Sequence, residues 1–272
     1  MRRAEGYFNG VENLKLYWQA WTPAEAKANI LIFHGFGEHS GRYINLVSTL
    51  VPQGYALWTF DQHGHGRSPG KRGVIRSFSD YVENGTRFAQ QVIPQDLPLL
   101  VLGHSMGSII AMNWLEHWPQ VKGAILSGTG QRLARGEGFQ YKVLEILNRL
   151  VPNLVLKFPL PTEFISRDPQ VVAGYDADPL THGRISVRLA VEMKRALATG
   201  RTKISGAKIP ILVQCGTQDC SFCCQEELFH GLTTPDKTIF LYQGLRHEVY
   251  NELEADRELV LRDLSNWLLP RI

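Results

Sequence analysis

A five-residue motif, Gly-His-Ser-Met-Gly at residues 103–107, constrains the fold of this chain more than any other feature. The apolar residues before it, Leu99–Leu102, predict a buried strand, and residues 108–115 after it predict a helix packed on a sheet. A serine at a sharp turn between a strand and a helix needs glycine on both sides, because the backbone passes too closely there for a side chain. We therefore expect Ser105 to be a nucleophile at the end of a strand; the alternative is a plain strand-to-helix turn.

An activated serine requires a base and an acid that orients the base. Residues 209–215 predict a strand, and the turn beyond it carries Asp219. The next predicted strand, 238–242, is followed by His247. With the serine first along the chain, this order predicts Asp219 as the acid and His247 as the base. Each residue alone also has an ordinary explanation, as a turn-forming aspartate or as a helix-capping or surface histidine.

Acyl transfer through a serine also needs N–H donors for the negatively charged oxygen that forms on the substrate carbonyl. The backbone N–H of Met106, at the start of the helix after the serine, is one candidate. The second donor is expected from the loop 34–38, which follows the predicted strand 29–33. Its glycines allow the backbone to turn an amide inward.

Charge and composition exclude several other classes of function. The 29 basic and 26 acidic residues give a net charge of +3 and form no basic stripe, so a nucleic-acid partner is not indicated. Histidines and carboxylates do not occur at metal-ligand spacing, and we expect neither a metal nor another cofactor. No apolar run reaches about 18 residues and the first residues are polar, which favours a cytoplasmic enzyme.

The cysteines are clustered, with three of the four between residues 220 and 224. Cys220 and Cys223 form a C-x-x-C pattern, but no second pair of Cys or His residues completes a zinc site. We therefore expect free thiols.

Predicted strands and helices alternate from residue 30 onward, which indicates a mostly parallel sheet covered by helices on both faces. An alternating segment at 14–20 predicts an antiparallel strand at the N-terminal edge. Ligands bind such sheets at the carboxyl ends of the strands. Ser105, Asp219 and His247 all fall at such ends.

The alternation of predicted strands and helices stops at residues 131–202. This change predicts an insertion between two core segments, 1–130 and 203–272. The insertion is rich in apolar residues, and three prolines between residues 151 and 161 argue against a continuous helix there. Its apolar side chains either pack the insertion onto the core or form a lid that lines an acyl tunnel and touches a membrane.

Three segments of the chain resemble one family. His34–Tyr43 is similar to the H-G-x-G-E-H-S-G-R-Y segment of monoacylglycerol lipases and related lysophospholipases. Asp61–Ser68 is similar to their D-x-x-G-H-G-x-S loop, and residues 103–107 match their serine motif. The resemblance extends over nearly the whole chain. It implies an α/β-hydrolase fold with an inserted cap, and esterase action on single-chain acylglycerols.

The same resemblance implies roles for individual residues. Phe36 and Met106 correspond to the backbone N–H donors of the oxyanion hole. Glu38 and Arg42 correspond to residues near the glycerol-binding end, although the two could equally form a local ion pair that orders the loop. Mammalian members carry a second histidine three residues after the catalytic one, where this chain has Tyr250. We include Tyr250 among the candidate substrate-binding residues.

The leading hypothesis is a serine carboxylester hydrolase that cleaves monoacylglycerols to glycerol and fatty acid through an acyl-enzyme. The alternatives are a lysophospholipase and, more distantly, a serine aminopeptidase, which should offer carboxylates to a substrate ammonium group. A non-enzymatic binding protein on the same scaffold is disfavoured by the complete set of serine, acid and base. The expected partners are a lipid ester and, transiently, a membrane in contact with the cap.

Overall fold

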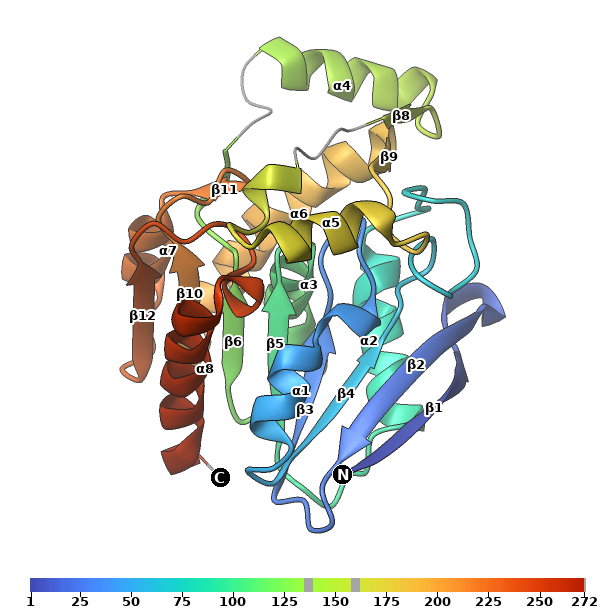
Figure 1. Cartoon of the computed structure of the whole chain (residues 1–272). Coiled ribbons are helices and arrows are strands. Elements are labelled where there is room, and N and C mark those ends of the chain that lie inside the picture. The colour runs from blue at the N-terminus through green and yellow to red at the C-terminus, as the bar shows by residue number, and fades with distance from the viewer. Residues whose placement is uncertain (135–138, 158–161, 272) are drawn as a thin grey trace.

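The computed structural model describes residues 1–134, 139–157 and 162–271. Its central feature is an eight-stranded sheet in the order β1-β2-β4-β3-β5-β6-β10-β12 (Figure 1). β2 is antiparallel to β1 and to β4, and the other neighbouring strands are parallel. The strands are β1 (Arg2–Asn9), β2 (Lys15–Thr22), β3 (Ala28–Phe33), β4 (Tyr55–Phe60), β5 (Leu99–His104), β6 (Ala124–Ser127), β10 (Ile211–Gly216) and β12 (Lys237–Tyr242).

The edge of the sheet differs from the prediction. The segment at 14–20 does form an antiparallel strand, β2, but β1 lies outside it and is the true edge. Only Phe8 of β1 is buried, since small residues, Ala4 and Gly6, occupy the other positions on its inner face. Without large apolar residues at every second position, the alternation of β1 is too weak to indicate a strand.

Helices cover both faces of the sheet because the central strands carry apolar residues on both sides. Leu31 and Phe33 of β3 pack on one side, and Ile30 and Ile32 pack on the other. One face is covered by α1 (Ile44–Leu50) and α8 (Glu254–Leu268), the other by α2 (Ser79–Gln91), α3 (Met106–Trp114) and α6 (Val187–Ser205), while α7 (Gln225–Gly231) packs beside β12. This mostly parallel, helix-covered sheet confirms the predicted fold class.

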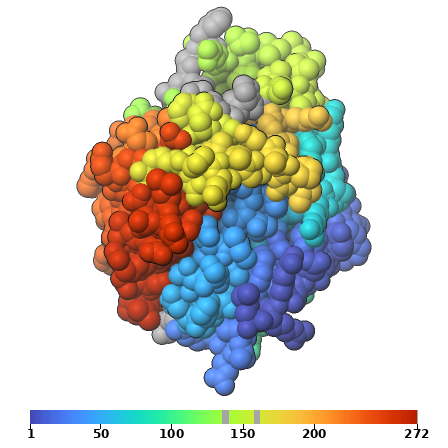
Figure 2. All heavy atoms as spheres, viewed as in Figure 1, coloured from blue at the N-terminus to red at the C-terminus, as the bar shows by residue number. Residues whose placement is uncertain are grey.

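The segment between β6 and α6 lies over the carboxyl ends of the parallel strands, at the top of Figure 1. Its described elements are β7 (Arg132–Leu133), α4 (Phe139–Leu150), β8 (Val155–Lys157), the short 3-10 helix η4 (Thr162–Phe164), α5 (Pro169–Ala177) and β9 (Arg184–Ser186). β7 pairs with β11 (Phe222–Cys223) of the core, and β8 pairs with β9. In Figure 2 the segment around α5, drawn in yellow, lies across this end of the core.

The predicted boundary of the insertion at residue 202 falls inside α6. This helix packs against α3 and contributes Leu189, Leu197 and Ile204 to the core. The predicted interruption at 151–161 is described only as far as β8, and its last residues lie outside the described part of the chain.

Candidate active site

Ser105 lies at a strained turn between β5 and α3. Its backbone has φ +55° and ψ −121°, a conformation that residues other than glycine rarely adopt. A Cβ at Gly103 would lie 2.3 Å from the carbonyl oxygen of Gly107, and one at Gly107 would lie 1.9 Å from that of Phe33. Both glycines are therefore required by close packing of the backbone, which holds the Ser105 side chain at the end of the strand.

Asp219 and His247 meet at the carboxyl ends of two neighbouring strands, β10 and β12. His247 Nδ1 lies 2.8 Å from Asp219 Oδ2. The other carboxylate oxygen, Oδ1, accepts hydrogen bonds from the backbone N–H groups of Ser221 and Phe222, at 2.7 and 3.2 Å. The carboxylate is thus fully engaged, and its orientation toward the imidazole is fixed from both sides.

The same arrangement shifts both pKa values. Burial alone would raise the pKa of Asp219, but His247 and the two backbone N–H donors hold it below its ordinary value. Burial would lower the pKa of His247, but the negative charges of Asp219, Glu248 and Glu38 outweigh burial and raise it. Asp219 therefore stays ionised and the protonated imidazole is stabilised, as expected of an acid and base pair.

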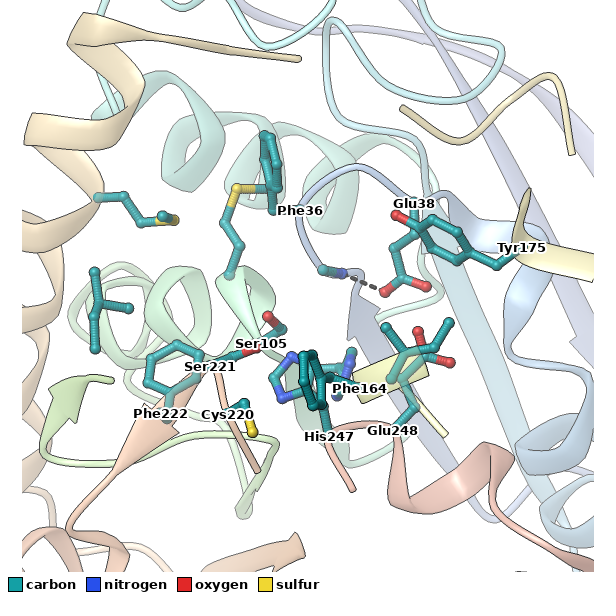
Figure 3. Close-up of a pocket in the computed structure, with 16 residues that line it drawn as sticks. Phe36, Glu38, Ser105, Phe164, Tyr175, Cys220, Ser221, Phe222, His247 and Glu248 are labelled. Atoms are coloured by element: carbon teal, nitrogen blue, oxygen red, sulfur yellow. Dashed lines mark hydrogen bonds between the residues drawn. The ribbon is translucent and has the colours of Figure 1, made fainter. Parts of the chain in front are cut away.

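Ser105 and His247 line the same cavity, which has a volume of about 140 Å³ (Figure 3). Its other lining residues are mostly apolar and come from the core and from the insertion: Phe36, Met106, Leu133, Phe164, Ile165, Met193 and Phe222. A cavity with this lining suits an apolar part of a ligand beside the serine hydroxyl.

The two predicted oxyanion donors also belong to this cavity. Met106 is the first residue of α3, so its backbone N–H has no partner within the helix. Phe36 lies between Gly35 and Gly37, and its N–H makes no hydrogen bond with another described residue. Gly37 has φ +74°, and its carbonyl oxygen accepts a hydrogen bond from the N–H of His182 in the insertion. The insertion therefore supports the loop that presents Phe36.

Glu38 and Arg42 form the ion pair that the sequence left as one of two interpretations. Glu38 Oε1 accepts hydrogen bonds from the Gly35 N–H (2.6 Å) and the Tyr43 hydroxyl (2.7 Å), and Oε2 accepts one from Arg42 (2.9 Å). Burial would raise the pKa of Glu38, but Arg42 beside it lowers the pKa to about 2. Glu38 lines the cavity as a fully bonded carboxylate, whereas Arg42 is not among the described residues that line it.

Sequence reasoning missed the second partner of Arg42. The Arg42 guanidinium donates to both oxygens of Glu248, at 2.6 and 2.8 Å, and Tyr175 stacks on it at 4.6 Å. Glu248 directly follows His247, so Arg42 connects the loop of the oxyanion donor with the loop of the base. In the sequence, only the position of Glu248 next to His247 indicates that Glu248 lies near the site. Nothing indicates its contact with Arg42, because residues 42 and 248 are far apart in the sequence.

The structure places Tyr250 away from the cavity. Its ring is buried with α1 and α8, and its hydroxyl donates to Gln214 Oε1 of β10 at 2.7 Å. Tyr250 is not among the described residues that line the cavity beside Ser105, but it lines a smaller neighbouring pocket together with Glu38, Arg42 and Glu248. The substrate contact expected from the resemblance stays a prediction.

The thiol beside the acid gives a first testable prediction. Cys220 is exposed and lines the cavity next to Asp219, whereas Cys215 is buried and its pKa is raised to about 12 by burial. We expect N-ethylmaleimide to inhibit the enzyme by placing bulk in the acid loop. The variant Cys220→Ser should keep most activity and resist the reagent, with Cys223→Ser as the matched control that stays sensitive. If N-ethylmaleimide inhibited both variants equally, the inhibition would come from another thiol.

Comparisons with known proteins agree with this geometry. A family model described as serine aminopeptidase, S33 (Hydrolase_4), matches residues 24–254. The chain is 31% identical over 279 residues to a monoacylglycerol lipase of Mycolicibacterium smegmatis, covering 99% of this chain and 98% of that protein. It is 28% identical over 265 residues to the monoglyceride lipase of Homo sapiens, covering 94% and 87% of the two chains. Among solved structures, the monoacylglycerol lipase of Paleococcus ferrophilus has a TM-score of 0.85 and 29% identity over 94% of this chain and 99% of that one.

Proposed function

We propose that this chain, which belongs to the serine aminopeptidase S33 (Hydrolase_4) family, hydrolyses monoacylglycerols to glycerol and a fatty acid. The observation that carries the proposal is the meeting of Ser105 and the Asp219–His247 pair at one apolar cavity. Relatives named as monoacylglycerol lipases, similar over nearly the whole chain, support the choice of substrate.

In the proposed mechanism, Ser105 Oγ attacks the ester carbonyl while His247 accepts its proton. Asp219 holds the imidazole in the tautomer that leaves Nε2 free to accept. The backbone N–H groups of Phe36 and Met106 donate to the developing oxyanion, and each such donor stabilises the transition state by roughly 3 kcal/mol. His247 then protonates the leaving glycerol, and water activated by the same residue releases the fatty acid.

The aminopeptidase alternative needs a free carboxylate for the substrate ammonium group. Two carboxylates line the cavity, those of Glu38 and Glu248, but both are bonded to Arg42. A lipid ester with an uncharged head group fits this cavity better. A lysophospholipase differs only in the head group and remains the second candidate.

A substrate panel tests the proposal. We expect kcat/KM for 1-monoacylglycerols to exceed that for lysophosphatidylcholine and for an amino-acid arylamide, with triacylglycerols poorly cleaved because one cavity admits one chain. A higher kcat/KM for lysophosphatidylcholine would favour the lysophospholipase, and cleavage of the arylamide alone would favour the aminopeptidase.

The pH dependence gives a second prediction. Because the pKa of His247 is raised and the neutral imidazole is the base, kcat/KM should begin to fall with decreasing pH already above the ordinary histidine pKa of about 6.5. Replacing Glu248 by Gln removes a negative charge beside His247, so the acidic limb should move to lower pH. The matched control, Glu116→Gln on the surface, should leave the limb in place. An unmoved limb in Glu248→Gln would contradict this electrostatic account.

We also propose that the insertion acts as a cap that contacts membranes. It carries exposed apolar side chains on and after α4, among them Ile146, Leu150, Val151 and Leu154. Among the described residues, no helix has both the length and the apolar character needed to cross a bilayer. Contact of the cap with a lipid surface would therefore be peripheral, and the cytoplasmic location stays a prediction from the sequence.

A further inference from the structure

A groove beside the cap is lined by positively charged side chains, where three segments of the chain meet. Its lining residues come from a loop of the core, from the antiparallel β8–β9 ribbon and from the turn before β9: Lys71, Arg72, Val155, Lys157, Pro179, Thr181, His182, Gly183 and Arg184. None of these described residues is acidic, and none of the four Lys and Arg side chains takes part in an ion pair with another described residue. In Figure 1 the ribbon of β8 and β9 lies next to this core loop, which is drawn in cyan.

Two of the cations lie directly opposite each other in the β8–β9 ribbon. In the antiparallel pairing of β8 with β9, Lys157 is the partner of Arg184. Like charges at directly opposed positions destabilise an antiparallel pair of strands. An anion bound between the two side chains would relieve this unfavourable pair, which lies on a two-stranded ribbon of three residues per strand.

Close backbone packing holds the other two cations against the same ribbon. The Gly73 carbonyl accepts a hydrogen bond from the Ser186 N–H at 2.8 Å, and a Cβ at Gly73 would lie 1.9 Å from the Arg184 carbonyl oxygen. Lys71 and Arg72 immediately precede this contact. Arg72 Nη2 donates to the Gly66 carbonyl, while its Nη1 is buried without a hydrogen-bond partner among the described residues. Lys71 and Arg72 therefore lie beside the Lys157–Arg184 pair in the lining of the groove.

The positive charge of the groove also affects the pKa of His182. Burial lowers the pKa of His182 to about 4, and the positive charges of Arg72 and Arg184 contribute to the decrease. His182 therefore adds no charge of its own near neutral pH and leaves the groove to its four permanent cations.

We infer that this groove docks the chain on membranes by binding the phosphate groups of anionic phospholipids. The inference rests on the proposed function, since it places the active-site cavity at the surface where monoacylglycerols reside. Charge complementarity favours an anionic bilayer as the occupant, and the exposed apolar residues Leu154 and Leu156 flank the groove residue Val155 along the chain. Basic side chains and neighbouring apolar side chains together are the combination that binds an anionic lipid surface.

Vesicle binding by the full chain tests the inference. Wild type should sediment with vesicles of phosphatidylcholine and phosphatidylglycerol, bind vesicles of phosphatidylcholine alone far more weakly, and detach as salt is raised. The double variant Lys157→Gln/Arg184→Gln should bind the anionic vesicles about 30-fold more weakly, from two lost cations near the surface. The matched control Lys122→Gln/Lys208→Gln, with the same loss of charge at the amino ends of the strands, should bind like wild type.

Equal binding of the groove variant and wild type, or equal loss in both double variants, would overturn the inference. A thermal melt adds a readout that is independent of vesicles. Removing the opposed cations should leave Tm unchanged or raise it, and a large fall in Tm would overturn the inference by showing that Lys157 and Arg184 stabilise the β8–β9 ribbon instead. Hydrolysis of a soluble short-chain ester by wild type is measured in parallel. If wild type did not hydrolyse this ester, the proposed function would be refuted. The vesicle experiment would still test whether the groove binds anionic membranes.

Discussion

Replacing Ser105 by alanine should lower kcat for a monoacylglycerol by about 10⁴-fold or more, because the nucleophile is lost while the rest of the site remains. Alanine keeps the Cβ, so the strain at φ +55° is unchanged, and the free energy of unfolding should stay within about 0.5 kcal/mol of wild type. Steady-state kinetics and a urea melt measure the two quantities. Turnover close to wild type in a folded variant would remove Ser105 from the mechanism.

The second large effect is expected for Asp219→Asn. The asparagine oxygen can still accept from the Ser221 and Phe222 N–H groups, which turns its NH₂ group toward His247 Nδ1. The imidazole must then carry its proton on Nε2 and cannot accept the proton of Ser105. A loss of about 10⁴-fold in kcat is the usual result of this change in tautomer.

Asp61 provides the contrast for Asp219, since it too follows a strand and carries a buried carboxylate. Its two oxygens accept from the backbone N–H groups of Ser40 and Arg67, each at 2.8 Å, and hold neighbouring loops together. Asp61→Asn should therefore reduce the free energy of unfolding by about 1–3 kcal/mol and leave kcat near wild type. If Asp61→Asn lost kcat in a folded protein and Asp219→Asn kept it, Asp61 and not Asp219 would be the acid.

The sequence was most informative where local backbone geometry restricts residue type. The glycines at 103 and 107 are needed by atoms within 2.3 Å of their missing side chains, so the turn at Ser105 could be predicted from five letters. The buried strands β3, β4 and β5 were equally clear, because each is a short apolar run bounded by turn residues. The order of Asp219 and His247 then followed from the positions of two further strands.

Features that depend on long-range packing were not predictable in the same way. The Arg42–Glu248 pair joins residues 206 positions apart, and nothing in the spacing of either residue indicates the other. Phe164 and Tyr175 reach the cavity only because the insertion lies over the carboxyl ends of the strands. The hydrogen bond of Tyr250 to Gln214 is another long-range contact, which its position three residues after His247 does not indicate.

The most direct test of the central claim is to map the residue that reacts with an alkyl fluorophosphonate. This reagent modifies an activated serine, and its single alkyl chain should occupy the apolar cavity beside Ser105. We predict one adduct per chain, located on Ser105 by peptide mass spectrometry, formed more slowly in the presence of a monoacylglycerol and absent from Asp219→Asn on the same timescale. An adduct on any other residue, or labelling that a monoacylglycerol does not slow, would contradict the account.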